Sequence, residues 1–158
     1  GNAKMLLSGK KLIVQGAADS KSKSINIPAK VTVGNISFDV TSIQDGAFKG
    51  NSKITDVTAG SGLKKIGNSA FEKCSKLKSV NVSFTKLNSS GKKAFYNFKL
   101  LTTVTLKTTK LTKSNVGADA FAKTNAKCTF KVPKNKVSAY KKIFKSKGAA
   151  AKIKVVKN

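Results

Sequence analysis

The chain has 158 residues, of which 39% are hydrophobic and 24% are charged, and this composition favours a folded domain with a sizeable core over a disordered chain. It carries 32 basic residues, all of them lysine, against six acidic residues. The absence of histidine excludes serine and cysteine nucleophiles activated by histidine and leaves no ligand set typical of zinc, and no run reaches the roughly 18 apolar residues of a membrane span. We therefore expect no enzyme activity, no metal or cofactor, and no membrane insertion.

The excess of lysine raises the question of nucleic-acid binding, since strongly basic chains often bind nucleic acids. Lysine presents a hydrated point charge, whereas arginine reads guanine through two hydrogen bonds and stacks on bases. Because the chain has no arginine, we expect no specific nucleic-acid site.

Residues 1–39 are predicted to form a β cap at the N-terminal end. Apolar residues on both sides of Ser8-Gly9 predict a strand–turn–strand unit, and Gly34-Asn35 between two alternating runs predicts a β-hairpin. Residues 1–14 lack the long apolar segment of a secretion signal, so we expect any signal or anchor to lie outside this chain.

Residues 40–133 are predicted to form about four structural repeats. An Ala-Phe pair recurs at intervals of 23, 24 and 26 residues, with its Phe at Phe48, Phe71, Phe95 and Phe121. A period in the twenties is the signature of a leucine-rich solenoid, in which stacked copies bury a core that one copy cannot bury alone.

The positions around each Phe support this interpretation. Apolar residues recur nine and eleven residues after each Phe, and a separation of two puts side chains on one face of a strand. An aliphatic residue usually stands five residues before each Phe, and another stands six residues after it. Ser90 and Lys127 are the exceptions in these two series.

Residues 134–158 are predicted to form a C-terminal cap. The preceding strand ends at Pro133, and apolar side chains at helical spacing predict a helix over residues 137–147. Gly148 suits the end of that helix, and residues 151–156 are typical of a short final strand.

Several segments resemble the BspA-like leucine-rich repeats of bacterial surface proteins, above all "LKKIGNSAFEKCSKLKSVNV" with its Ile, Ala-Phe, Cys, Leu and Val-x-Val pattern. Cys74 matches the family's Cys position, whereas the other repeats have Asn51, Phe98 and Thr124 there. The resemblance covers about residues 24–158. It implies a mostly β, right-handed leucine-rich-repeat solenoid and a secreted or surface-attached bacterial protein, extracellular or at the cell surface.

The strand face opposite the core is the candidate partner-binding surface. Its outward positions are expected eight and ten residues after each Phe: Asp56, Thr58, Ser79, Asn81, Thr103, Thr105, Thr129 and Lys131. Tyr96 directly follows a Phe and is a further candidate, because an exposed Tyr can anchor an interface. A soluble exposed face with no ligand is the alternative interpretation of the same pattern.

The C-terminal end is strongly positive, since no acidic residue follows Asp119 and twelve lysines lie between Lys123 and Lys157. A polar cover that keeps the end of the solenoid soluble explains this pattern, and so does a docking site for an anionic polymer.

Two smaller sets of residues have structural explanations. Asp45 and Asp119 stand just before the Ala-Phe turns, which favours turn capping over catalysis. Cys74 and Cys128 lie two coils apart, roughly 10 Å at the strand spacing, which predicts two free thiols.

Taken together, the sequence predicts a monomeric, non-enzymatic binding or adhesion module that recognises a protein or glycan partner through the polar strand face. Electrostatic docking to an anionic polymer, such as a cell-wall polymer or a glycan, and a structural spacer within a larger protein remain alternatives.

Overall fold

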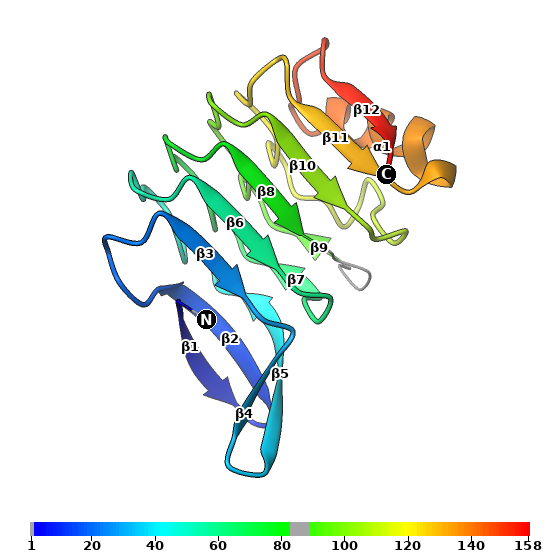
Figure 1. Cartoon of the computed structure of the whole chain (residues 1–158). Helices are drawn as coiled ribbons and strands as arrows, with labels where there is room; N and C mark the ends of the chain where they lie inside the picture. Colours follow the sequence, from blue (N-terminus) through cyan, green and yellow to red (C-terminus); the bar gives the residue numbers. More distant parts are fainter. Residues whose placement is uncertain (1, 83–88) are drawn as a thin grey trace.

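The computed structural model describes residues 2–82 and 89–158. The chain winds into a solenoid whose coils each contribute one short strand to a long parallel sheet, here the front sheet (Figure 1). In the described part of the chain its strands are β3 (Ser24–Ile27), β6 (Asp56–Ala59), β8 (Ser79–Val82), β10 (Thr103–Leu106), β11 (Thr129–Val132) and β12 (Lys154–Lys157). They pair in the order β3-β6-β8-β10-β11-β12, so coils adjacent in sequence are adjacent in space.

A second sheet, the back sheet, lies behind the first and includes the N-terminal cap (Figure 1). Its strands within residues 2–82 and 89–158 are β1 (Ala3–Ser8), β2 (Lys11–Ala17), β4 (Lys30–Val33), β5 (Ile36–Ile43), β7 (Lys65–Ile66) and β9 (Ser89–Ser90). The pairs β1–β2 and β4–β5 are antiparallel hairpins, and both were predicted from the turns at Ser8-Gly9 and Gly34-Asn35. The strands β2, β5, β7 and β9 continue in parallel.

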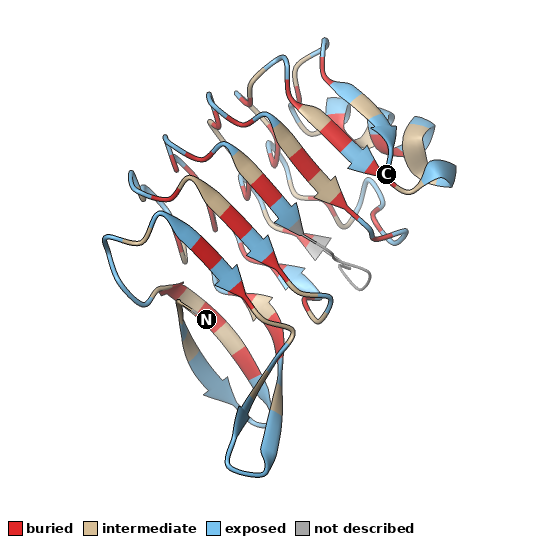
Figure 2. Ribbon diagram, viewed as in Figure 1, coloured by how far each residue is buried: buried red, intermediate tan, exposed pale blue. Residues whose placement is uncertain are grey.

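The core fills the space between the two sheets. Buried and outward-facing residues alternate along the front strands (Figure 2), as expected for strands that bury one face. Val57, Val80, Val104 and Phe130 share one register and are buried. The Phe of each Ala-Phe pair is also buried, which confirms its prediction as a core position.

Each Ala-Phe pair lies in a tight turn, the Ala-Phe turn, that bonds to the turn of the next coil. The N–H groups of Phe48, Phe71 and Phe95 donate to the carbonyl oxygens of Ala70, Ala94 and Ala120 at 2.7, 3.1 and 2.9 Å. Two positions in every turn have positive φ, one just before the Ala and one two residues after the Phe. They are occupied by Gly46, Ser69, Lys93 and Asp119, and by Gly50, Lys73, Asn97 and Lys123.

Polar groups join the Ala-Phe turns along the solenoid axis. The carboxylate of Asp45 accepts hydrogen bonds from the backbone and side-chain N–H groups of Asn68 at 2.8 and 3.0 Å. The side-chain oxygen of Asn68 in turn accepts from the N–H of Lys92 at 2.8 Å. Asp45 therefore ties its own coil to the next one, a wider role than the predicted capping of its own turn.

Glycine is required where consecutive coils approach most closely. A Cβ atom on Gly67, Gly91 or Gly117 would collide with a backbone nitrogen of the preceding coil. Close backbone approach, and not unusual dihedral angles, is the reason for glycine at these three positions.

The C-terminal cap consists of a short 3₁₀ segment (Lys134–Lys136), the helix α1 (Val137–Ser146) and the strand β12. The helix, its stop near Gly148 and the final strand were all predicted. Tyr140 and Phe144 are buried, and the Tyr140 hydroxyl donates to the Thr108 carbonyl at 2.9 Å and accepts from the Leu111 N–H at 3.1 Å. The helix thereby fixes the loop that follows β10 against the last coils.

The prediction of about four repeats was too low, because in the described part of the chain the front sheet has six strands. The coils of β3 and β12 lack an Ala-Phe pair, so the motif did not reveal them. β3 lies within residues 1–39, the range predicted as the N-terminal cap, yet it pairs with β6 in the register of the repeats. In the last coil, Phe144 from the helix reaches the Phe121 ring, with 4.9 Å between centroids.

The two exceptions to the aliphatic series have different outcomes. Ser90 is buried at a core position, and its hydroxyl has no hydrogen-bond partner among the described residues. Lys127 is exposed, and the neighbouring Cys128 is buried in its place. In this coil the inward position is therefore seven residues after the Phe instead of six.

Candidate binding surface

The structure brings eight of the nine candidate residues together on the outward face of the front sheet, here the strand face. Parallel pairing aligns them in two rows along the solenoid axis. One row holds Asp56, Ser79, Thr103 and Thr129, and the other holds Thr58, Asn81, Thr105 and Lys131. Thr58, Asn81 and Lys131 are exposed, and the other five are half-buried.

The strand face is longer than the sequence predicted. Ser24 and Asn26 of β3 extend the two rows at one end, and Lys154 and Val156 of β12 extend them at the other. These four residues were missed because their coils lack the Ala-Phe pair. The alternation of Ile25 and Ile27 with polar residues was the signal that could have found β3.

The strand face carries hydroxyl and amide groups and little negative charge. Asp56 is the acidic residue on its strands within the described ranges, and one of its carboxylate oxygens accepts a hydrogen bond from the Thr55 hydroxyl at 2.7 Å. Such a face offers many donors and acceptors on a rigid sheet, which suits recognition of a polar partner.

Tyr96 lies apart from the strand face, in an Ala-Phe turn. Its ring is half-buried, and the ammonium groups of Lys93 and Lys123 lie 5.3 and 5.5 Å from the ring centroid. Both distances fall within the range of a cation–π interaction. Tyr96 therefore makes cation–π contacts with two lysines on the turn side and does not extend the two polar rows.

The turn side also carries a buried carboxylate. Glu72 is 7% exposed, and its carboxylate lies 3.3 Å from the Lys49 ammonium. Burial alone would raise the pKa of Glu72, but hydrogen bonds from Ser69 and Lys49 and the charges of Lys49 and Lys93 together hold that pKa below its ordinary value. Glu72 thus stays ionised and neutralises part of the local positive charge.

Few of the other lysines are paired. A second ion pair joins Lys30 to Asp39 at 3.4 Å on the exposed β4–β5 hairpin, and these two pairs are the ones found in residues 2–82 and 89–158. With a net charge of +26, most of the positive charge on the surface is left for an external anion.

The two cysteines are buried free thiols, as predicted. The Cys74 thiol donates to the Phe48 carbonyl oxygen at 3.0 Å. Burial raises the pKa of both thiols to about 12, so neither forms the thiolate needed for nucleophilic attack near neutral pH.

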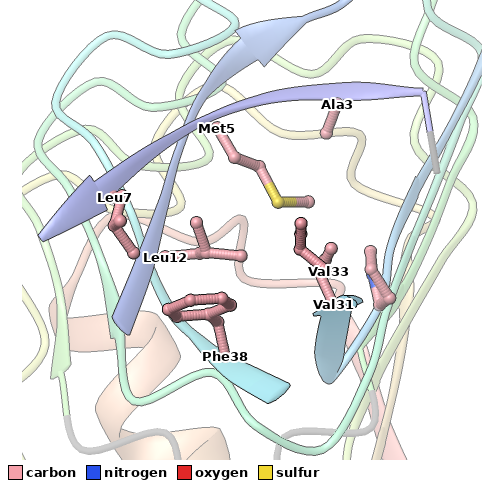
Figure 3. Close-up of a pocket in the computed structure, with 8 residues that line it drawn as sticks. Ala3, Met5, Leu7, Leu12, Val31, Val33 and Phe38 are labelled. Carbon is pink, nitrogen blue, oxygen red and sulfur yellow. The ribbon is translucent and has the colours of Figure 1, made fainter. Parts of the chain in front are cut away.

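A hollow of about 380 Å³ opens in the N-terminal cap between the β1–β2 and β4–β5 hairpins (Figure 3). It is lined by Ala3, Met5, Leu7, Leu12, Pro28, Val31, Val33 and Phe38. Ligand pockets combine an apolar lining with a few polar groups that fix orientation, and none of these eight side chains is polar. The hollow therefore offers apolar contact without the means to orient a small molecule.

The described residues contain no group of three or more Cys, Asp or Glu side chains placed to hold a metal ion. In the same part of the chain, no helix has the length and apolar character needed to cross a membrane.

Comparison with known proteins gives a consistent family relationship. A family model described as the BspA type leucine-rich repeat region matches residues 18–150 in six copies. No curated protein matches the chain in sequence.

Three solved structures are similar to this one. A leucine-rich repeat protein from Bacteroides capillosus ATCC 29799 is 24% identical with a TM-score of 0.68, and the match covers 84% of this chain and 94% of that one. A leucine-rich repeat protein from Bacteroides ovatus ATCC 8483 is 27% identical with a TM-score of 0.56, over 84% of this chain and 39% of that one. The T. pallidum leucine-rich repeat protein is 17% identical with a TM-score of 0.61, over 84% of this chain and 62% of that one.

Proposed function

Because the chain belongs to the BspA-type leucine-rich repeat family, we propose that it is a non-enzymatic binding or adhesion module of a secreted or surface-attached bacterial protein. Its partner is a protein or a glycan, and it binds on the strand face. The family relationship supports the repeat scaffold, and solenoids commonly bind through such extended faces.

The observation that carries this proposal is the alignment of outward polar side chains in register over consecutive front strands. Hydrogen-bonded neighbours hold every strand of this face, so a partner meets groups whose positions are already fixed. Pre-organisation of this kind lowers the entropic cost of binding.

We further propose that the chain is a monomer. The edge strand β12 presents the exposed residues Lys154 and Lys157, and lysines on an edge strand oppose pairing with another sheet. Repulsion between chains of net charge +26 acts in the same direction.

The proposal is tested by binding the purified chain to a panel of host matrix proteins, neutral and anionic glycans and cell-wall polymer, at about 0.05 M and 0.5 M salt. The strand-face variant carries Thr58→Glu and Asn81→Glu, which place two bulky charges on exposed positions of the face. The control variant carries Thr109→Glu and Ser138→Glu, which make the same change of charge at exposed positions elsewhere.

We expect one partner to bind at both salt concentrations, and the strand-face variant to lose that binding while the control variant keeps it. Circular dichroism checks that both variants fold. Retention of binding by the folded strand-face variant would show that the strand face is not the binding surface.

A further inference from the structure

A row of lysines runs along one side of the solenoid, beside the strand face. Every front strand is preceded by an exposed lysine within its four preceding residues. One such lysine from each coil defines the lysine row: Lys23, Lys53, Lys76, Lys99, Lys127 and Lys152. The loops that carry them lie side by side at the N-terminal ends of the front strands (Figure 1). Five strand-to-strand intervals give the row a length of about 24 Å.

The row is dense in positive charge and nearly free of negative charge. Lys21, Lys78 and Lys154 are exposed on the same side and add to it. Among the described residues, Asp19 and Asp56 are the acidic groups near this side, and each already accepts a hydrogen bond within its own loop or strand start. Neither makes an ion pair with a lysine of the row.

The backbone of the row is fixed at several points. The N–H groups of Lys53 and Lys127 donate to the side-chain oxygens of Asn51 and Asn125 at 2.8 and 3.0 Å, the pattern of an Asx turn. At the C-terminal end of the row a hollow of about 540 Å³ is lined by Ala126, Lys127, Thr129, Lys152 and Lys154. Three lysines that line one hollow provide a place for a single anionic substituent.

We propose that the lysine row binds a linear anionic polysaccharide, with sulfate or carboxylate groups along the lysines and with sugar hydroxyls against the neighbouring Ser, Thr and Asn side chains of the strand face. Charges that recur once per coil match a polymer with recurring anionic groups better than they match a compact ligand. This inference goes beyond the proposed function, because it adds the lysine row beside the strand face and commits to one chemical class of partner.

The composition of the surface favours a polysaccharide over a nucleic acid. Proteins that bind single strands stack bases on exposed aromatic or arginine side chains. The chain has no arginine or tryptophan, and every aromatic side chain in residues 2–82 and 89–158 is buried or half-buried. The row thus offers charge and the strand face offers hydroxyl-binding groups, without a stacking platform.

The test compares two variants that each remove four positive charges. The row variant carries Lys53→Gln, Lys76→Gln, Lys99→Gln and Lys127→Gln. The control variant carries Lys64→Gln, Lys107→Gln, Lys113→Gln and Lys141→Gln, at exposed positions outside the row. Size-graded heparin oligosaccharides are titrated into both variants, the unchanged chain and the strand-face variant at several salt concentrations. Oligothymidylate of matched charge is the second probe.

We expect the row variant to lose more than about tenfold in heparin affinity at low salt, and the control variant to lose about twofold through the weaker long-range field. The slope of log affinity against log salt concentration falls by about one for each lysine that contacts the polymer. Affinity rises with oligosaccharide length until the oligosaccharide spans the row, about 24 Å, and then levels off. Oligothymidylate binds more weakly and responds equally to both variants.

Three results would overturn the inference. Equal losses in the row and control variants would mean that total charge alone attracts the polymer. Oligothymidylate binding that matches heparin in strength and depends on the row would mean that the site accepts any polyanion. Loss of heparin binding in the strand-face variant alone would assign the glycan to the strand face and leave the proposed function standing without the row.

Discussion

The rings of Phe95 and Phe121 lie parallel, with 5.5 Å between their centroids and 3° between their planes, although they come from different coils. Phe48 and Phe71 stack at 5.0 Å and 5°, and Phe71 and Phe95 at 5.8 Å and 10°. These separations exceed the strand spacing of about 4.8 Å slightly, as expected for offset stacking. Phe71 and Phe95 therefore each contact the ring before and the ring after them, and the stack couples four coils into one core.

Replacing a ring in the middle of this stack should destabilise the whole solenoid. For Phe95→Ala we expect a loss of about 3–5 kcal/mol in the free energy of unfolding, because the cavity removes contacts on both sides. Leu100→Ala is the control, since Leu100 is 46% exposed and should cost under about 1 kcal/mol. Urea unfolding followed by circular dichroism measures both, and equal losses would contradict the coupling.

Ser90 offers a substitution that stabilises the protein. Its buried hydroxyl has no partner among the described residues, and burying an unpaired polar group costs about 1–3 kcal/mol. We expect Ser90→Ala to raise the free energy of unfolding by about 1 kcal/mol. Ser75→Ala, at an exposed position, should stay within about 0.5 kcal/mol of the unchanged chain. A Ser90→Ala variant that unfolds more easily would show that the hydroxyl has a partner.

Lys73 has a φ of +61° in its Ala-Phe turn, where the first repeat has Gly50. A side chain in this left-handed conformation destabilises the folded chain by roughly 1–2 kcal/mol. Glycine removes this strain, but its more flexible unfolded state offsets part of the gain. We expect Lys73→Gly to stabilise the fold by about 0.5–1 kcal/mol. Lys76→Gly, at a position without positive φ, should destabilise it. Thermal unfolding of the two variants distinguishes backbone strain from loss of a charge, since both remove one lysine.

Glu72 should make stability depend on pH in the acidic range. Its pKa is lower in the folded chain than its ordinary value, so the unfolded chain binds a proton more readily. The stabilisation is fully present above the unfolded pKa of about 4.3 and is lost as the pH falls through the lower folded value. We expect the melting temperature to fall more steeply below pH 4 in the unchanged chain than in Glu72→Gln. Parallel curves for the two proteins would show that Glu72 is not coupled to folding.

The period of the Phe residues was enough to predict the front strands β6, β8, β10 and β11, their register and their outward residues. This is because each coil has the core positions of its front strand at the same distances from its Phe. The hairpin at Gly34-Asn35 and the helix α1 carry strong local signals and were also predicted. The coils of β3 and β12 were not counted as repeats because neither has an Ala-Phe pair, and β12 was predicted only as a final strand of the cap. In the last coil a helix supplies Phe144 instead.

Other features of the surface could not be predicted from the spacing of the Phe residues, because they depend on how separate segments lie together in space. The lysines of the lysine row stand one to four residues before each strand. They lie on the same side of the solenoid although they do not occupy the same position in each repeat. The apolar hollow forms between two hairpins that β3 separates in the sequence. The placement of Tyr96 on the turn side follows from the direction in which the chain leaves the buried Phe95, which the pattern alone did not give.

The hydrogen bonds between successive Ala-Phe turns have the same partners in each coil from Phe48 to Phe95. An added coil could therefore join its neighbours through existing contacts, and it would lengthen the molecule by about 4.8 Å. Each such addition would also bring a further cation to the side where the front strands begin. Duplication of the DNA segment that encodes one coil could thus raise the number of lysines that contact a polymer by one at a time. The existing contact sites would not have to change.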